Sequence, residues 1–171
     1  MPRVLNRFLL VLGLLAGLLG GLTAATATAA DSVPHRILNN ATGGSLLPHG
    51  YGSDSSDGIV MYAWNPALTY GGDEWTFEDV GGTYLIRNTK TGKCLKPGGP
   101  WYGKTYVTQG VCNTTLEFQW GLQPRSDGQY KITSRSSRQV MTPYYGTALG
   151  EVVVLEPDSN IAKNWWSITP V

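Results

Sequence analysis

The tripeptide Trp120-Gly121-Leu122 is the best guide to the fold of this chain, because two variants of it occur elsewhere. Trp75-Thr76-Phe77 lies 45 residues before it, and Trp166-Ser167-Ile168 lies 46 residues after it. Similar spacing relates the isoleucines Ile37, Ile86 and Ile132 and the prolines Pro48, Pro97 and Pro143. A fixed internal period indicates a protein built from copies of one structural unit. We therefore divide the sequence into repeats that cover about residues 34–80, 81–124 and 125–171.

Each repeat has the pattern of short β-strands separated by turns. Segments rich in valine, isoleucine and tyrosine, such as 83–86 and 151–155, alternate with turn pairs such as Asp57-Gly58 and Gly98-Gly99. No long segment after residue 30 keeps the 3.6-residue apolar period of an amphipathic helix. Four strands can be placed in each repeat, about twelve in all, which predicts an all-β barrel or sandwich.

The three tryptophans are expected to be core residues. One repeat of four strands cannot enclose its own apolar face, whereas three repeats around an axis can bury a shared core. The same large side chain from each repeat would fill that core, and an aromatic side chain buries on the order of 150–250 Å². We therefore assign Trp75, Trp120 and Trp166 to the structural core rather than to a ligand site.

The first thirty residues have the layout of a secretory signal peptide. Arg3 and Arg7 precede an apolar run of about 15 residues, which is shorter than the ~20 residues of a membrane-spanning helix. Small residues follow this run, so we expect cleavage near Ala29 or Ala30. No later stretch is apolar and long enough to span a bilayer. The sequence predicts that residues 31–171 are secreted as a single domain.

Charge and cysteine content narrow the functions to consider. The chain carries 13 basic and 12 acidic residues, so strong attraction to nucleic acid is not expected. An exported chain meets an oxidising compartment, and Cys94 and Cys112 are therefore expected to form a disulfide bond. Zinc is not expected, because His35 and His49 show no ligand spacing.

Metal, cofactor and enzyme sites are all predicted to be absent. The segment 54–58 contains acidic oxygens, but it lacks the length and closing glutamate of a calcium loop. No Gly-x-Ser-x-Gly elbow is present, the only two histidines lie near the start of the mature segment, and both cysteines are expected to be oxidised. Lys131, Arg135 and Arg138 are interpreted as a solvated basic face.

The repeat pattern resembles the ricin B-type lectin family, whose repeats end in a Gln-x-Trp-x-apolar signature. The three Trp-x-apolar segments are similar to that signature. The Gly92-Lys93-Cys94-Leu95 turn, and the pairing of Cys94 with Cys112 just before Asn113, resemble the family's disulfide within a repeat. The resemblance covers residues 31–171 and implies a β-trefoil, an all-β fold of three four-stranded repeats with pseudo-threefold symmetry. It also implies a secreted, non-catalytic module that binds galactose or related sugars, one per repeat, and makes Asn113 a carbohydrate-binding candidate.

The chain departs from the family pattern at two sets of positions. The glutamine of the signature is replaced by Asp73, Phe118 and Asn164. The position of the family's sugar-binding aspartate is occupied by Leu47, Lys96 and Thr142. Such an acid accepts hydrogen bonds from sugar hydroxyls, and a site built on hydrogen bonds discriminates poorly once a partner is missing.

A different recurring pattern suggests where binding could occur. An aromatic residue followed by glycine comes after each aligned proline, as Tyr51-Gly52, Tyr102-Gly103 and Tyr145-Gly146, and Trp101 and Tyr144 precede the last two. Glycine permits a tight turn, and a loop aromatic offers a flat face with a polar tip. We predict that these loops form three shallow, threefold-related carbohydrate-binding surfaces. The alternative is that the tyrosines cap the ends of the barrel.

Two classes of partner remain open. A lectin would bind glycans or glycoconjugates. The chain also resembles the cell-binding subunits of cytolethal distending-type toxins, which implies a protein-docking or cell-surface-binding trefoil as the alternative.

Overall fold

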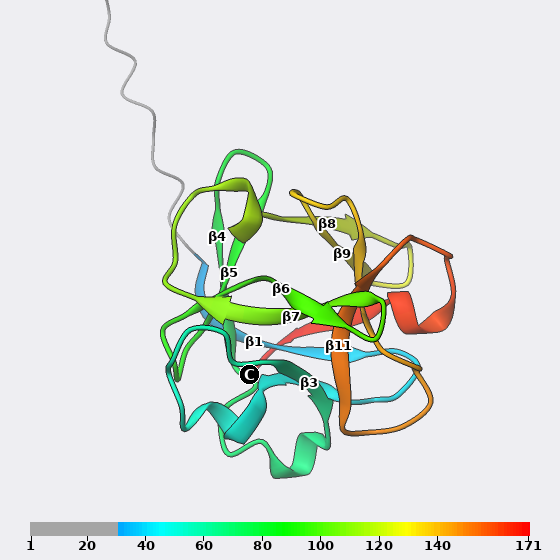
Figure 1. Ribbon diagram of the computed structural model, residues 1–171, viewed down its shortest axis with the longest axis horizontal. Helices are drawn as coiled ribbons and strands as arrows, with labels where there is room; N and C mark the ends of the chain where they lie inside the picture. The colour runs from blue at the N-terminus through cyan, green and yellow to red at the C-terminus, as the bar shows by residue number, and fades with distance from the viewer. Residues whose placement is uncertain (1–30) are drawn as a thin grey trace, which may run out of the picture.

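The computed structural model describes residues 31–171, so the predicted signal peptide at residues 1–30 lies outside the described residues. The described chain forms four strands in each repeat (Figure 1). The first repeat contains β1 (Asp31–Asn39), β2 (Ser45–Pro48), β3 (Met61–Trp64) and β4 (Trp75–Asp79). The second contains β5 (Tyr84–Asn88), β6 (Cys94–Trp101), β7 (Lys104–Gly110) and β8 (Trp120–Pro124). The third contains β9 (Gln129–Ser134), β10 (Val140–Pro143), β11 (Glu151–Glu156) and β12 (Trp166–Pro170).

Four short 3₁₀ helices lie in the loops between these strands. They are η1 (His49–Gly52), η2 (Pro66–Leu68), η3 (Leu116–Phe118) and η4 (Ala162–Asn164). None of the helices within residues 31–171 is long and apolar enough to cross a membrane.

The first and last strands of the repeats close into a six-stranded antiparallel barrel. Around the ring, β1 pairs with β12, β12 with β9, β9 with β8, β8 with β5, β5 with β4, and β4 with β1. The apolar residue that ends each tryptophan motif pairs with an isoleucine of the neighbouring repeat, as Phe77 with Ile86, Leu122 with Ile132, and Ile168 with Ile37. The third repeat therefore pairs with the first, and the three repeats that share this spacing form a closed ring.

The middle strands of each repeat form a hairpin, and the three hairpins are joined to one another by strand pairing. These hairpins are β2–β3, β6–β7 and β10–β11. Strand β11 pairs with both β3 and β7, which joins the hairpins to one another (Figure 1). The predicted all-β trefoil with pseudo-threefold symmetry is confirmed.

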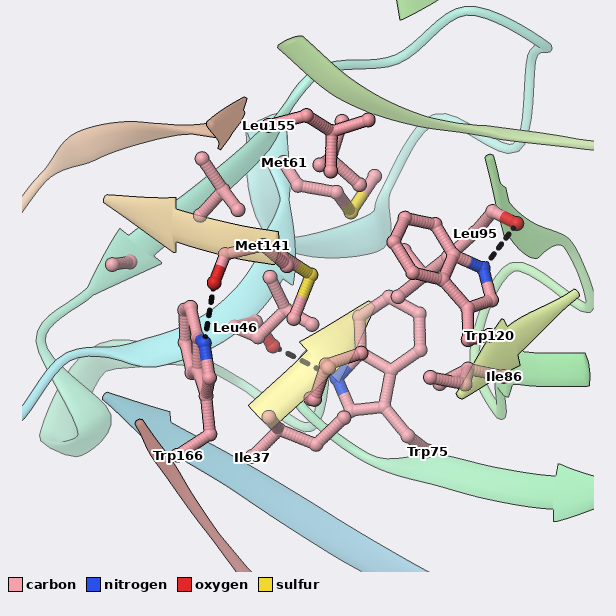
Figure 2. Packing of buried hydrophobic residues seen from close by; sticks show 14 of the residues in the cluster. Ile37, Leu46, Met61, Trp75, Ile86, Leu95, Trp120, Met141, Leu155 and Trp166 are labelled. Atoms are coloured by element: carbon pink, nitrogen blue, oxygen red, sulfur yellow. Dashed lines mark hydrogen bonds between the residues drawn. The ribbon is translucent and has the colours of Figure 1, made fainter. Parts of the chain in front are cut away.

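The core contains one tryptophan from each repeat. Trp75, Trp120 and Trp166 are all 0% exposed. Each indole N–H donates a hydrogen bond to a main-chain carbonyl in the second strand of its own repeat, and the acceptors are Leu46, Leu95 and Met141, at 2.8, 3.0 and 2.9 Å (Figure 2). A buried indole needs such a partner, because an unsatisfied polar group in an apolar core is destabilising. The repeats therefore preserve both the side chain and its hydrogen bond.

The residues that replace the signature glutamine are buried and structural. Asp73 is fully buried, where it accepts a hydrogen bond from the Ser45 hydroxyl at 2.8 Å and lies 3.2 Å from the guanidinium of Arg36. Asn164 is also fully buried and accepts a hydrogen bond from Ser159. Phe118 packs against Cys94 in a small apolar cluster. Asp73 and Asn164 are thus held inside the protein, whereas Phe118, although buried, also lines a cavity at the surface of the second repeat.

The disulfide prediction is confirmed, whereas the predicted basic face is wrong for one residue. Cys94 and Cys112 form a bond of 2.03 Å between β6 and the segment after β7. Arg135 and Arg138 are exposed, but Lys131 is buried. Its ammonium group lies 2.6 Å from Asp158 and 4.6 Å from the ring centre of Trp165, and these two partners stabilise the buried charge.

Candidate functional site

The family's acidic position is filled in a different way in each repeat. In the first repeat, Leu47 lines a cavity of about 330 Å³ together with Tyr62, Trp64 and His49. In the third repeat, Thr142 is fully buried, and its hydroxyl donates a hydrogen bond to the main-chain carbonyl of Lys163 at 2.9 Å. Neither residue offers a carboxylate to a ligand.

In the second repeat, the acidic position belongs to an ion pair. The ammonium group of Lys96 lies 3.2 Å from the carboxylate of Glu117 and 5.2 Å from the ring centre of Phe118. Asn113 lines the same cavity, of about 580 Å³, but its side-chain oxygen already accepts the N–H of Thr115 at 2.9 Å. The candidate Asn113 therefore lies in this polar cavity and stabilises a turn.

Four of the predicted aromatic residues come together across the second and third repeats. Ring centres are 5.5 Å apart for Trp101 and Tyr102, 6.5 Å for Tyr102 and Tyr144, and 4.6 Å for Tyr144 and Tyr145. We call these four residues the aromatic surface. Tyr102 is 82% exposed and Tyr145 is 71% exposed. Aromatic side chains this exposed contribute little to folding, and on loops they are typical of binding sites.

The fifth aromatic candidate, Tyr51, lies in a separate group in the first repeat. Its ring centre is 5.2 Å from Tyr70 and 6.2 Å from Trp64. The predicted arrangement of three separate, threefold-related surfaces is therefore incorrect in its geometry, because Tyr102 and Tyr144 contact each other. The two neighbouring hairpin ends meet, whereas the Tyr51 ring packs against Tyr70 and Trp64 of the first repeat and the Tyr51 carbonyl accepts a hydrogen bond from Lys90 of the second.

The turn at the end of the β6–β7 hairpin explains the exposure of Tyr102. Trp101 pairs with Lys104, so Tyr102 and Gly103 form a two-residue turn. Both have positive φ angles, 45° and 80°, as the type I′ hairpin turn requires. A tyrosine in the left-handed region is uncommon, and here it directs the ring away from the body of the protein.

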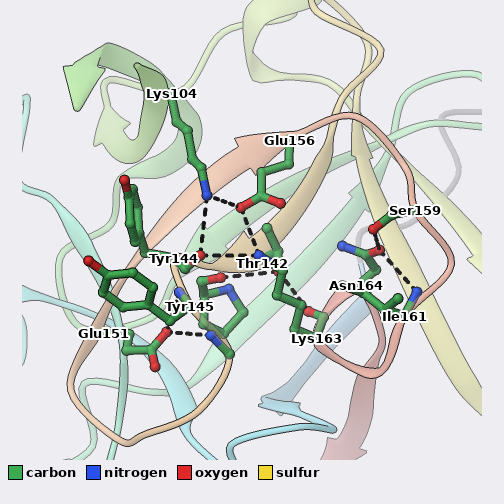
Figure 3. Close-up of polar contacts among 12 residues, drawn as sticks. Lys104, Thr142, Tyr144, Tyr145, Glu151, Glu156, Ser159, Ile161, Lys163 and Asn164 are labelled. Carbon is green, nitrogen blue, oxygen red and sulfur yellow. Dashed lines mark hydrogen bonds and ion pairs between the residues drawn. The ribbon is translucent and has the colours of Figure 1, made fainter. Parts of the chain in front are cut away.

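The loop that carries Tyr145 is held by one carboxylate (Figure 3). One oxygen of Glu151 accepts the N–H groups of Tyr145 and Gly146, both at 2.7 Å. The other oxygen accepts those of Thr147 and Ala148, at 2.9 and 2.8 Å. Burial acts to raise the pKa of Glu151, but these four donors outweigh it and hold the pKa below the usual value of 4.5.

A lysine joins the two loops to each other. The ammonium group of Lys104 donates a hydrogen bond to the main-chain carbonyl of Tyr144 at 3.2 Å and lies 4.0 Å from the centre of the Tyr144 ring. It also forms an ion pair with Glu156, whose carboxylate binds Lys163 at 2.9 Å (Figure 3). Lys163 donates to the same carbonyl of Tyr144 at 3.1 Å. Loops from two repeats are thus fixed by a network in which two lysines share the carboxylate of Glu156 and the carbonyl of Tyr144.

Sequence reasoning did not identify several members of these groups. Tyr70 is 71% exposed, and the pair Tyr70-Gly71 repeats the aromatic–glycine signal that marked the other loops. It was missed because it does not follow an aligned proline. Lys104, Glu151 and Glu156 carried no sequence signal, since their roles depend on contacts between different strands. Within residues 31–171, no group of three or more histidine, cysteine or acidic side chains is placed to hold a metal ion.

Comparison with solved structures gives matches to other trefoils. The designed threefold-symmetric protein ThreeFoil matches with a TM-score of 0.74 and 20% identity, over 81% of this chain and 99% of that one. The Macrolepiota procera ricin B-like lectin, solved in complex with lactose, matches with a TM-score of 0.65 and 18% identity, over 84% and 99%. The Haemophilus ducreyi cytolethal distending toxin matches with a TM-score of 0.67 and 16% identity, over 82% and 84%. At these identities the likeness concerns the fold.

Other matched structures come from larger chains, and this chain spans 31% and 17% of two of them. No curated protein matches the sequence. A family model with the description "Ricin-type beta-trefoil lectin domain-like" matches residues 71–156, which is half of the chain. The matched segment contains the second repeat whole and parts of the other two. The chain belongs to the ricin-type β-trefoil lectin domain-like family.

Proposed function

We propose that this chain is a secreted, non-catalytic carbohydrate-binding module that recognises glycans or glycoconjugates through the aromatic surface. The observation that carries the proposal is the display of Tyr102 and Tyr145, which remain largely exposed although hydrogen bonds from Glu151, Lys104 and the Tyr144 hydroxyl hold the backbone of their loops. A site that is ordered before binding loses less conformational entropy when the ligand arrives.

The chemistry of these residues suits a sugar. The C–H faces of a pyranose ring pack against the electron-rich face of an aromatic ring, while phenol hydroxyls exchange hydrogen bonds with sugar hydroxyls. Such a surface does not need the family's aspartate. This accounts for a lectin-like chain in which Leu47, Lys96 and Thr142 occupy the acidic positions.

A glycan array probed with residues 31–171 tests the proposal. We expect binding to a restricted class of sugars, with a loss of about tenfold or more in affinity for Tyr102→Ala and Tyr145→Ala together. Thermal unfolding would show that the double variant remains folded. Tyr70→Ala is the matched control, because Tyr70 is as exposed as Tyr145 but lies outside the aromatic surface. An array with no bound sugar, or a double variant with unchanged binding, would contradict the proposal.

A second candidate function is docking to a protein, as a subunit of a larger assembly. The missing acid in all three repeats favours it, and so does the fold shared with the Haemophilus ducreyi toxin. Tyrosine and tryptophan are also enriched at the centres of protein interfaces. A silent glycan array, combined with a stable complex between this chain and a protein that is lost in the same double variant, would favour docking.

A further inference from the structure

We propose that the aromatic surface binds one extended, uncharged, β-linked oligosaccharide across the boundary between the second and third repeats, instead of one sugar unit per repeat. The inference rests on the proposed function, because it assumes that the exposed tyrosines contact carbohydrate. It adds the length, charge and geometry of the ligand.

The continuity of the surface is the first argument. Tyr102 extends from the β6–β7 hairpin and Tyr144 from the segment after β10, yet their ring centres lie 6.5 Å apart. The Tyr144 hydroxyl donates a hydrogen bond to the main-chain carbonyl of Tyr102 at 3.4 Å. Lys104 also crosses the boundary to reach the carbonyl of Tyr144. The two loops therefore form one surface, and a ligand on one loop lies beside the other.

The spacing of the rings is the second argument. The two most exposed rings, Tyr102 and Tyr145, are separated by Tyr144, with steps of 6.5 and 4.6 Å between ring centres. Each step is comparable with the length of one hexose unit. A single sugar covers about one aromatic side chain, so contact with both exposed tyrosines requires consecutive units. β-Linked chains are extended and keep the C–H faces of successive units accessible, whereas many α-linked chains coil.

The charge balance is the third argument. Four charged side chains surround the base of the surface, namely Lys104, Lys163, Glu151 and Glu156. The two lysines share the carboxylate of Glu156, and the carboxylate of Glu151 is occupied by four main-chain N–H groups. The charges sum to zero, and no cation among them lacks a partner. A sulfated or carboxylated glycan would gain little here, while a neutral chain would avoid the cost of burying its own charge.

The first repeat is not part of this site. The backbone carbonyls of Tyr51 and Tyr70 both accept hydrogen bonds from Lys90, at 2.9 and 3.1 Å, which fixes these loops to each other. Among the described residues, no ring contact joins Tyr51 to the aromatic surface. The first repeat therefore provides an internal control.

Isothermal titration with ligands of increasing length tests the inference. The probes are cello-, laminari-, xylo- and β-1,4-galacto-oligosaccharides, each from the monosaccharide to the hexasaccharide. For at least one series, we expect affinity to rise by about tenfold or more between the monosaccharide and the tetrasaccharide, with one chain bound per protein. Tyr102→Ala or Tyr145→Ala alone should remove most of this gain, so that the affinity of the variant no longer rises with the length of the ligand. Tyr70→Ala should preserve the gain.

The outcomes separate this inference from the proposed function. Equal affinity for short and long ligands, or several monosaccharides bound per protein, would leave carbohydrate binding intact and overturn the extended site. Preference for a sulfated or carboxylated chain, or an equal loss in Tyr70→Ala, would also overturn it. No binding to any probe in the panel would overturn the inference, and a silent glycan array would in addition remove the proposed function.

Discussion

At the scale of single residues, the carboxylate of Glu151 connects fold and function. Its two oxygens accept four consecutive main-chain N–H groups, from Tyr145 to Ala148. These donors belong to a loop with no strand or helix of its own, so the side chain replaces the missing backbone partners. The position of the exposed Tyr145 ring thus depends on the ionised form of one residue.

Replacing Glu151 with glutamine should therefore destabilise the chain in a pH-dependent way. We expect a loss of about 1–3 kcal/mol in the free energy of unfolding at neutral pH, because a neutral amide offers one oxygen to four donors. The folded pKa of Glu151 is below 4.5, so the carboxylate stabilises the fold above its unfolded pKa. This contribution is lost as the pH falls through the folded pKa.

Thermal unfolding of the wild type and Glu151→Gln at a series of pH values measures this effect. The difference in Tm should be largest near neutral pH and should shrink below pH 4.5. Glu117→Gln is the control, because its exposed ion pair with Lys96 contributes about 0–1 kcal/mol. A difference in Tm that stays constant at every pH would show that the charge of Glu151 is not responsible.

At the scale of the elements, β4, β8 and β12 have the same function in each repeat. Each begins with a fully buried tryptophan whose indole N–H reaches a carbonyl of the repeat's second strand. The strand thus contributes a backbone ladder to the barrel, a large side chain to the core and a hydrogen bond to the adjacent hairpin. Because the three environments are equivalent, the three positions should respond alike to substitution.

Phenylalanine at Trp75, Trp120 or Trp166, one at a time, should lower the free energy of unfolding by about 2–3 kcal/mol. The substitution leaves a cavity and an unsatisfied carbonyl. Urea denaturation followed by circular dichroism measures the change. Trp101→Phe, on the aromatic surface, is the control and should change stability by about 0.5 kcal/mol or less. A cost at one tryptophan several times that at the others would contradict the equivalence of the repeats.

At the scale of the whole molecule, the sequence predicts the fold far better than the site. The barrel follows from local patterns repeated at one spacing. Three copies of the same strands, turns and buried tryptophan bury their apolar faces together when they are arranged around one axis. The aromatic surface depends on how two hairpins lie relative to each other. The contact between Tyr102 and Tyr144, and the link through Lys104, join residues about 40 positions apart and leave no periodic signal.

The same reasoning explains the error at Lys131. Its place close to Arg135 and Arg138 in the sequence suggested a solvated face, but its partners Asp158 and Trp165 come from the end of the third repeat and contact the side chain. Burial of a charge is decided by such distant partners, which a linear pattern does not reveal. In contrast, the pairing of Cys94 and Cys112 could be predicted, because the chain has only two cysteines.

The closed ring also predicts how the molecule responds to loss of its disulfide bond. Cys94→Ala with Cys112→Ala should lower the free energy of unfolding by about 2–4 kcal/mol, because the bridge closes a loop with a sequence separation of 18.

Each repeat pairs with both neighbours, so the whole chain should still unfold in one transition when the disulfide bond is absent. Urea unfolding followed by tryptophan fluorescence and by circular dichroism should then give the same midpoint. Glycan affinity should persist in the folded variant, because Cys94 and Trp101 lie at opposite ends of β6. A separate early transition of the second repeat would show that the ring does not couple the repeats.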